Sequence, residues 1–329
     1  RPILLDRFLD GAAEYDVDAL CDGRDVYIGG VVEHIEEAGV HSGDSFGVLP
    51  PCELSEGHRE RVITIARQVA RDLGVIGCIN LQLAIHEGEV YVLEVNPRAS
   101  RTVPFVAKAT GVPLAKLATR LSLGATLGEL RPVPGRRDGL FFVKGPVFPW
   151  RKLPGSSGVL GPEMRSTGEV MGVGETFGEA YAKAMIAAWT PLPKAGRVLL
   201  SARNRLKPAL VPICRELVEL GMTLAGTEGT AAYLRDHGFD CPTIARVDAP
   251  GDSLIDRILD GSIQLVLNMP RGRANREDEG RMRIAGLRHG VPVLTGLASA
   301  RAAVQAIRWL QQGDHPVRAL QGMDPGSWA

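Results

Sequence analysis

Carboxamide and carboxylate side chains recur at even positions along the stretch INLQLAIHEGEVYVLEVNPR, residues 79–98. If this stretch forms an antiparallel hairpin, Gln82 lies opposite Glu94 and Asn80 lies opposite Asn96, all on one face. Oxygen ligands of this kind suit Mg²⁺ or Mn²⁺, which take few protein ligands when substrate phosphates complete the coordination. The spacing therefore predicts a divalent metal site for a phosphate-bearing substrate, and the alternative is a solvated hairpin face.

The hairpin that positions these residues is predicted to have a three-residue loop at residues 87–89, which pairs His86 with Val90. The odd positions then form one apolar face, made of Ile79, Leu81, Leu83, Ile85, Tyr91, Leu93 and Val95. Arg98 and Arg101 follow the second strand, and a guanidinium group can bind phosphate or carboxylate through two hydrogen bonds. The chemistry expected at this end of the hairpin is therefore recognition of an anion next to the metal.

The segments around this hairpin predict a mixed sheet with helices. The expected strands are 17–20, 26–32, 77–85 and 90–95, and the expected helices are 55–73, 114–123 and 176–188. Ser55 and Thr176 are predicted N-caps, since a hydroxyl can accept a hydrogen bond from a free N–H of the first turn. Residues 131–162 are rich in Pro and Gly and are predicted to be irregular.

From residue 191 onward the pattern becomes a regular alternation of strands and helices. The expected strands are 198–200, 223–224, 243–246, 265–267 and 291–294, and the expected helices are 209–220, 230–237, 253–260, 277–289 and 298–311. This alternation predicts a five-stranded parallel α/β sheet with helices on both faces. Ligands of such sheets bind at the carboxyl ends of the strands.

The composition is that of a globular protein of about two domains, with 329 residues, 45% apolar and 23% charged. The net charge is +0, which removes the usual signature of binding to nucleic acid or to an anionic membrane. No apolar run approaches the ~20 residues of a membrane-spanning helix. The five cysteines are scattered, so neither a disulfide framework nor a structural zinc site is expected, and a reducing cytoplasm is the natural setting.

Three stretches resemble the carbamate-phosphorylating half of the carbamoyl-phosphate synthase large chain: DVDALCDGRDVYIGGVVEHIEEAGVHSGDS, EVNPRASRTVPFVAKATGVPLAK and GPEMRSTGEVMGVGETF. The resemblance extends through nearly the whole chain. It implies that residues 1–190 are the C-terminal lobe of an ATP-grasp domain and that residues 191–329 are a regulatory domain with a methylglyoxal synthase-like fold.

The resemblance also implies roles for single residues of the first domain. Gln82, Glu94 and Asn96 match metal ligands, so that Glu94 would bridge two Mg²⁺ or Mn²⁺ ions on the phosphates of the substrate ATP. Arg98 matches an arginine at the phosphoryl-acceptor end. Glu14 and His41 match residues that contact the nucleotide. Without the resemblance, Glu14 would be interpreted as a surface glutamate and His41 as an ordinary loop histidine.

In the second domain the resemblance implies a pocket for a nucleoside monophosphate effector, UMP or IMP, lined by Lys207, Thr227, Thr230, Arg246 and Asn268. The alternative for the segment 227–230 is an ordinary capped helix start. Glu36, Asp44 and Thr295 match residues that bind the activator ornithine in some members. Gly145 replaces an acidic residue of that site, so we expect nucleotide binding without ornithine activation.

The implied reaction is ATP-dependent phosphorylation of carbamate to carbamoyl phosphate, for arginine and pyrimidine synthesis, by a cytoplasmic ligase that also uses K⁺. The implied partners are a glutaminase small subunit, the N-terminal part of the large chain and possible further copies in a homo-oligomer. The glycine-rich ATP-grasp lobe is expected upstream of Arg1, so we expect the chain alone to be inactive. The alternatives are another ATP-grasp ligase or carboxylase, or a non-catalytic module that senses nucleotides.

Overall fold

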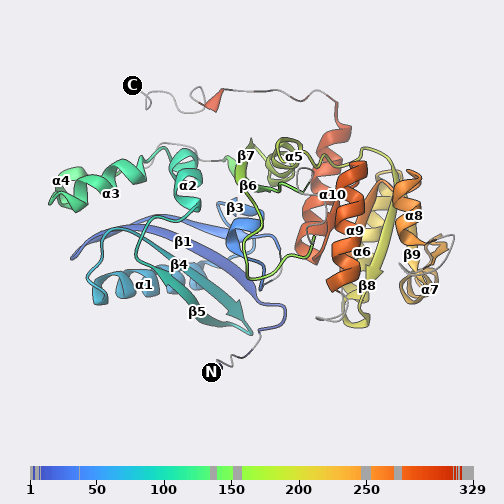
Figure 1. Ribbon diagram of the computed structural model, residues 1–329, viewed down its shortest axis with the longest axis horizontal. Coiled ribbons are helices and arrows are strands. Elements are labelled where there is room, and N and C mark those ends of the chain that lie inside the picture. The colour runs from blue at the N-terminus through green and yellow to red at the C-terminus, as the bar shows by residue number, and fades with distance from the viewer. Residues whose placement is uncertain are drawn as a thin grey trace. The chain divides into compact units, whose positions relative to one another are not determined.

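The computed structural model describes residues 3, 7, 9–36, 38–133, 139–150, 158–245, 253–269, 276–313, 315, 317, 319 and 320. The chain divides into two compact units (Figure 1). Unit 1 comprises residues 1–42, 47–138 and 317–329, and unit 2 comprises residues 43–46 and 139–316. The predicted division of the chain into family domains at residue 190 stays a prediction. None of the helices in the described ranges is long and apolar enough to cross a membrane.

Unit 1 contains five neighbouring strands in the order β5-β4-β1-β2-β3. Their bounds are β1 (Ala13–Asp22), β2 (Val26–His34), β3 (Gly47–Leu49), β4 (Ile76–His86) and β5 (Glu89–Asn96), and neighbours pair antiparallel. The helices of this unit are α1 (Glu56–Asp72), α2 (Thr102–Thr110), α3 (Leu114–Ser122) and α4 (Leu127–Leu130). The predicted strands and the helices α1 and α3 are confirmed, whereas β3, α2 and α4 were not predicted.

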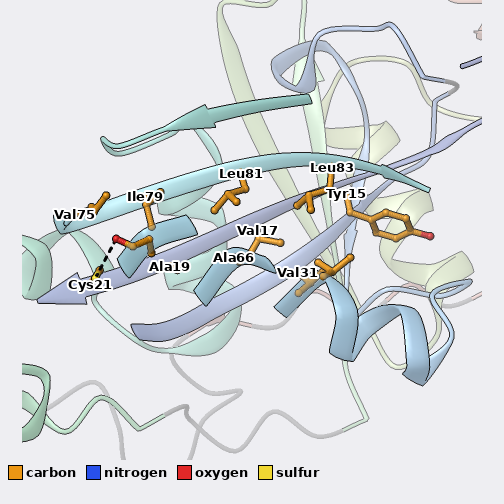
Figure 2. Close-up of a cluster of buried hydrophobic side chains, with 12 residues drawn as sticks. Tyr15, Val17, Ala19, Cys21, Val31, Ala66, Val75, Ile79, Leu81 and Leu83 are labelled. Atoms are coloured by element: carbon orange, nitrogen blue, oxygen red, sulfur yellow. Dashed lines mark hydrogen bonds between the residues drawn. The ribbon is translucent and has the colours of Figure 1, made fainter. Parts of the chain in front are cut away.

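Helix α1 lies along one face of this sheet and buries its apolar side there (Figures 1 and 2). The Ser55 hydroxyl accepts a hydrogen bond from the backbone N–H of His58, as predicted for the N-cap. Ala66 packs in one core cluster with Val17 and Leu81. Since side chains alternate along a strand, the even-numbered residues of β1 and β4 must point to the opposite face. Helices α2 and α3 lie on that side (Figure 1).

The turn of the β4–β5 hairpin differs from the prediction. Only Glu87 and Gly88 form it, with φ of 51° and 84°, a conformation typical of two-residue hairpin turns. His86 consequently pairs with Glu89 and not with Val90. The register then shifts by one residue between Leu83 and Gln82, which restores the predicted pairing from Gln82 onward, farther from the turn.

This shift decides which β5 side chains face the core. Val90 and Val95 pack against the core cluster. Val92 and Leu93 are 44% and 47% exposed at the edge of the sheet. The predicted inward positions of Tyr91 and Leu93 are therefore wrong, because Tyr91 pairs with Ala84 on the opposite face and Leu93 is the extra residue of the bulge.

Unit 2 begins with an antiparallel pair of strands, β6 (Phe141–Val147) and β7 (Gly168–Gly174), followed by helix α5 (Phe177–Ala187). Strand β6 lies inside the segment 131–162 that was predicted to be irregular, which is therefore wrong for residues 141–147. The Thr176 hydroxyl accepts from the backbone N–H of Glu179, which confirms the predicted cap. Gly172 permits the close packing of α5 on β7, since a Cβ atom there would lie 2.0 Å from the carbonyl oxygen of Ala180.

The rest of unit 2 is a five-stranded sheet in the order β10-β9-β8-β11-β12, with all neighbours parallel. The strands are β8 (Gly196–Ala202), β9 (Met222–Thr227), β10 (Thr243–Ile244), β11 (Leu265–Met269) and β12 (Val293–Leu294). The helices are α6 (Lys207–Glu219), α7 (Glu228–Asp236), α8 (Leu254–Leu259), α9 (Arg276–His289) and α10 (Leu297–Gln311), and a 3₁₀ turn spans Asn204–Leu206. The predicted parallel α/β fold is confirmed.

Candidate functional site

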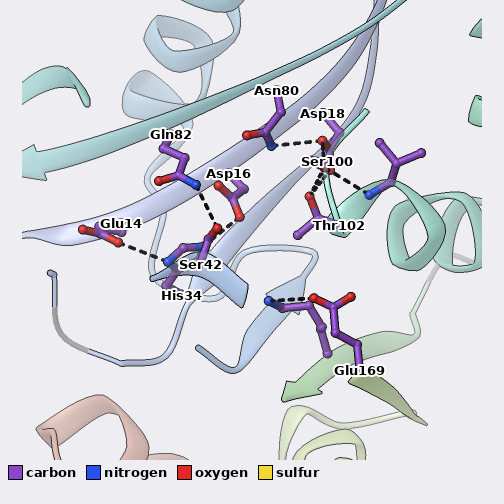
Figure 3. A network of polar contacts seen from close by, with 12 residues as sticks. Glu14, Asp16, Asp18, His34, Ser42, Asn80, Gln82, Ser100, Thr102 and Glu169 are labelled. Carbon is purple, nitrogen blue, oxygen red and sulfur yellow. Dashed lines mark hydrogen bonds and ion pairs between the residues drawn. The ribbon is translucent and has the colours of Figure 1, made fainter. Parts of the chain in front are cut away.

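The sheet face opposite α1 carries a cluster of polar side chains (Figure 3). Strand β1 contributes Glu14, Asp16 and Asp18 at every second position. In the register of the sheet, Gln82 of β4 is the partner of Asp16, and Asn80 is the partner of Asp18. Side chains alternate between the two faces along each strand, so the two paired strands bring these carboxylates and amides together on one face although they are far apart in the sequence.

The predicted metal ligands lie at the outer side of this cluster. Gln82 pairs with Glu94, and Asn80 pairs with Asn96, as the sequence predicted. The Gln82 amide nitrogen donates to the Ser42 hydroxyl at 2.8 Å, which fixes the amide group and leaves its oxygen for another partner. Glu94 is exposed, and Asn96 is half-buried. One carboxylate and two amide oxygens fit a hard divalent cation whose coordination is completed by phosphates.

Arg98 lies on the exposed segment that follows β5. Its guanidinium group donates to the side-chain oxygen of Asn96 at 3.1 Å and to the backbone oxygen of Ala99 at 3.0 Å. The predicted acceptor-binding arginine thus lies directly beside a predicted metal ligand. Asn80, in contrast, is 2% exposed and donates to the carboxylate of Asp18, so it belongs to the buried part of the cluster.

A buried histidine joins two of the β1 carboxylates. His34 Nε2 lies 3.0 Å from Asp16, and His34 Nδ1 lies 3.3 Å from Glu14. All three side chains are at most 10% exposed. The second carboxylate oxygen of Asp16 is buried and has no hydrogen-bond partner among the described residues. A bare buried carboxylate oxygen is costly, which indicates that a cation or a water completes this group.

Two hydrogen bonds tie the loop after β2 to the polar face. The backbone N–H of Gly39 donates to Glu14 at 3.0 Å. Ser42 accepts from Gln82. His41 lies between these tie points and is half-buried. The structure therefore brings the predicted nucleotide residues Glu14 and His41 to the same sheet face as the predicted metal ligands, with Glu14 itself buried beneath the loop.

The carboxyl ends of the parallel strands in unit 2 gather the predicted effector residues. Thr227 and Thr230 stand at the start of α7, after β9, and the Thr227 hydroxyl donates to Thr230 at 3.3 Å. Thr227 is the N-cap residue of α7, yet its side chain does not cap the helix. This differs from an ordinary capped start, and it leaves the first N–H groups of α7 available for an anion.

Lys207 opens helix α6, directly after β8 and its turn. Its ammonium group donates to the backbone oxygen of Gly229 and lies 5.8 Å from the ring centroid of Tyr233. Asn268, which is 3% exposed, stands near the end of β11, and Thr295 follows β12. The parallel order of the strands places all these residues at one edge of the sheet. Arg246, predicted for the same pocket, lies outside the described residues.

The surroundings of Gly145 oppose an acidic side chain at that position. A Cβ atom there would lie 2.8 Å from the ring of Phe46 and 3.2 Å from Val170. The Phe46 ring also packs against Tyr181, with ring centroids 5.2 Å apart. Asp44, a predicted ornithine-site residue, accepts backbone N–H groups of residues 165 and 166 at 2.8 Å each. An aromatic ring therefore fills the space that an acidic residue would need.

Sequence reasoning missed the inner part of the first site, namely Asp16, Asp18, His34, Ser42, Ser100 and Thr102. The signal that could have found the β1 members is the alternation of acidic residues in EYDVD, residues 14–18, because a strand places all three on one face. His34 and Ser42 carry no comparable local signal. Their role depends on neighbours from other strands.

Two parts of the chain match known protein families. Residues 1–130 match the family described as carbamoyl-phosphate synthase L chain, ATP binding domain. Residues 209–295 match the family described as MGS-like domain. The first match contains the predicted metal ligands, and the second begins two residues after Lys207 and extends to Thr295.

The similarity to curated relatives extends over nearly the whole chain. The carbamoyl phosphate synthase large chain of Acidobacterium capsulatum is 48% identical over 332 residues, which cover 99% of this chain and 30% of that protein. The carbamoyl phosphate synthase large chain, C-terminal section, of Methanopyrus kandleri is 45% identical over 338 residues, which cover 100% of this chain and 62% of that protein. The chain thus spans between about a third and three-fifths of these relatives.

A solved biotin carboxylase domain of a single-chain bacterial carboxylase is 18% identical, with a TM-score of 0.43, and the match covers 56% of this chain and 47% of that chain. The classification of the chain rests on the family matches and on the curated relatives, and the biotin carboxylase structure contributes nothing to it. The chain is a relative of the carbamoyl phosphate synthase large chain that combines an ATP-binding domain of that family with an MGS-like domain.

Proposed function

We propose that this chain carries the site at which ATP phosphorylates carbamate to carbamoyl phosphate, as part of a glutamine-dependent carbamoyl-phosphate synthase. The observation that supports this most directly is the pairing of Gln82 with Glu94 on the polar sheet face, with Asn96 and Arg98 beside them. In the reaction a carbamate oxygen attacks the γ-phosphorus of ATP, and ADP leaves with the electrons of the broken P–O bond. Phosphoryl transfer of this kind depends on positioning and charge neutralisation more than on a covalent nucleophile.

The residues of the polar sheet face would each contribute a different part of this reaction. Gln82, Glu94 and Asn96 would hold two Mg²⁺ or Mn²⁺ ions, which neutralise phosphate charge when they are bound. Arg98 orients the acceptor through its guanidinium group, and Asn96 holds that group in place. Glu14 holds the loop that carries His41 against the nucleotide. The bare carboxylate oxygen of Asp16 fits a K⁺ ion of the kind that the family resemblance implies.

A direct assay tests the proposed reaction. The full-length protein, given bicarbonate, ammonia and MgATP, should form carbamoyl phosphate and ADP, and the reverse reaction should form ATP from carbamoyl phosphate and MgADP. We expect Arg98→Met to raise the KM for carbamoyl phosphate in the reverse reaction. Arg59→Met, on the exposed side of α1, is the matched control. A wild-type protein that binds MgATP but forms no product in either direction would contradict the proposal.

We further propose that unit 2 binds a nucleoside monophosphate, UMP or IMP, and thereby regulates the enzyme. The uncapped start of α7 and the nearby ammonium group of Lys207 support a phosphate position at the carboxyl edge of the parallel sheet. The Phe46 ring over Gly145 supports the absence of an ornithine response. Calorimetry with UMP, IMP and ornithine tests both statements, and we expect heat of binding from a nucleotide and none from ornithine.

The length of the relatives supports a partner that is the remaining part of a large chain, and the family resemblance supports a glutaminase partner. A glutaminase small subunit would supply ammonia, and the remaining part of a large chain would supply the other half of the ATP site. Copurification with a glutaminase, together with glutamine-dependent formation of carbamoyl phosphate, is the expected result.

A further inference from the structure

Asp18 is a buried carboxylate that binds two separate segments of the chain (Figure 3). It is 1% exposed. Its Oδ1 atom accepts from the amide of Asn80 at 3.0 Å and from the hydroxyl of Ser100 at 2.7 Å, and its Oδ2 atom accepts from the hydroxyl of Thr102. Asn80 belongs to the sheet, whereas Ser100 lies in the segment that connects β5 to α2 and Thr102 is the first residue of α2.

The connecting segment carries Arg98 and is held at both of its ends. At the start, Asn96 pairs with Asn80 in the sheet, and the backbone N–H of Arg98 donates to the Asn96 carbonyl at 2.8 Å. At the end, Asp18 holds the two hydroxyls of Ser100 and Thr102. Arg98 thus lies between Asn96 and Ser100, and both ends of its segment are linked to the buried carboxylate of Asp18, the first through Asn80 and the second directly.

The chemistry of this anchor argues against a purely structural role. The groups that donate to the Asp18 carboxylate are one amide and two hydroxyls, and burial of an anion among neutral donors costs more stability than burial of an apolar side chain would. A carboxylate offers what an apolar residue does not, since two oxygens accept several hydrogen bonds in fixed directions. Precise placement of the connecting segment is the property that these bonds supply.

We propose that Asp18 is a positioning residue for phosphoryl transfer, which acts through Ser100 and Thr102 to hold Arg98 at the acceptor end of the site. This inference rests on the proposed function. It predicts that weakening the hydrogen bonds between Asp18 and the two hydroxyls raises the KM for carbamoyl phosphate and leaves the KM for the nucleotide unchanged, because the proposed role of Arg98 is at the acceptor end.

Thr102→Val tests this with little change in shape, since it replaces one buried hydroxyl by a methyl group. In the full-length protein we expect the KM for carbamoyl phosphate in the reverse reaction to rise about tenfold or more, with the KM for ADP within about twofold of wild type. Thr102→Ser restores the hydroxyl and should restore the KM. The matched control is Thr110→Val, at the other end of α2, where the hydroxyl donates to the backbone oxygen of Val106 and accepts from the backbone N–H of Val112.

The outcomes separate the two proposals. A selective rise in the KM for carbamoyl phosphate with rescue by Thr102→Ser supports the role of Asp18. Unchanged constants, or an equal change for both substrates, in a folded Thr102→Val protein would overturn that role and leave the proposed function standing. A wild-type protein without any reverse reaction would overturn the proposed function, and the role of Asp18 with it.

Discussion

Glu94 is the one carboxylate among the three predicted metal ligands, and its position at the edge strand explains its exposure. Its partner in the sheet, Gln82, is fixed by Ser42, whereas the carboxylate of Glu94 accepts no side-chain hydrogen bond from the residues that the structure describes. An unsupported carboxylate beside fixed amide oxygens is able to adjust to a cation that arrives with the nucleotide. The charge of Glu94, more than its hydrogen bonds, is therefore its expected contribution.

Glu94→Gln removes this charge and keeps the shape of the side chain. In the full-length protein we expect a loss of activity of about 100-fold or more, together with a higher Mg²⁺ or Mn²⁺ concentration for half-maximal rate. Titration of the rate with metal at saturating ATP measures both effects. Glu89→Gln, at the start of the same strand, is the control and should behave as wild type. Equal metal dependence of the two variants would refute the assignment of Glu94.

The buried carboxylate of Asp18 should make the free energy of unfolding of the protein depend on pH. Burial raises its pKa to about 6; hydrogen bonds from Thr102, Ser100 and Asn80 oppose this rise, and the charge of Asp16 adds to it. The folded state therefore binds the proton more tightly than the unfolded chain, whose aspartates titrate near 3.9. The stability contributed by protonation is fully present below about pH 4 and is lost as the pH rises through about 6.

Asp18→Asn does not titrate, so the comparison isolates this contribution. Between pH 4 and pH 7 we expect the free energy of unfolding of Asp18→Asn, relative to wild type, to increase by about 2 kcal/mol. Denaturant titrations across this range measure it. Parallel pH profiles for the two proteins would show that Asp18 titrates normally.

The packing of elements in unit 2 depends on close approaches at glycine. Helix α5 approaches β7 so closely at Gly172 that a Cβ atom would overlap the backbone of the helix, at 2.0 Å from the Ala180 oxygen and 2.5 Å from the Ala184 nitrogen. Backbone atoms of a helix move only with the whole helix. The spacing between α5 and the β6–β7 pair is therefore fixed by the absence of a side chain at this position.

Gly172→Ala should destabilise this packing. We expect a decrease in the free energy of unfolding of about 3 kcal/mol, at the upper end of the usual effect of overpacking. Gly168→Ala on the same strand is the matched control, because its Cβ would meet only the Cβ of Val147 at an ordinary 3.8 Å. Thermal or chemical unfolding of both variants measures this difference. Equal decreases in the free energy of unfolding would mean that α5 can be displaced from β7 at little cost.

At the scale of the whole molecule, the proposed function gives the chain two kinds of phosphate site. Unit 1 offers oxygen ligands on an antiparallel sheet face, which suits a metal-bound triphosphate. Unit 2 offers a helix start and an ammonium group at the carboxyl edge of a parallel sheet, which suits a monophosphate without metal. The two sites are therefore expected to respond differently to removal of divalent cations.

Lys207→Met should weaken nucleoside monophosphate binding about 10- to 100-fold, because it removes one charge-assisted hydrogen bond. Calorimetry in the presence of a metal chelator measures this affinity without interference from the metal-dependent site. Lys194→Met, at an exposed position of the same unit, is the control. Nucleotide binding that is lost with the chelator, or that is equal in the two variants, would place the monophosphate elsewhere.

Much of this architecture is readable from local pattern. The apolar periodicity and the caps at Ser55 and Thr176 predicted α1 and α5 correctly, and the alternation after residue 191 predicted the parallel sheet. The pairing of Gln82 with Glu94 followed from the period of two along a strand. Strand β6 escaped prediction because its Gly and Pro content resembles a loop, and its antiparallel pairing with β7 is a long-range contact that local sequence does not reveal.

The amino-acid sequence alone determined which side chains share a strand face or a helix face, because those periods are properties of the backbone. Tertiary structure alone decided which faces meet. The bulge at Leu93 depends on the geometry of the turn, and the contact of His34 with Asp16 depends on the register between β1 and β2. The anchoring of Thr102 by Asp18 joins residues 84 positions apart, a proximity that no local period encodes.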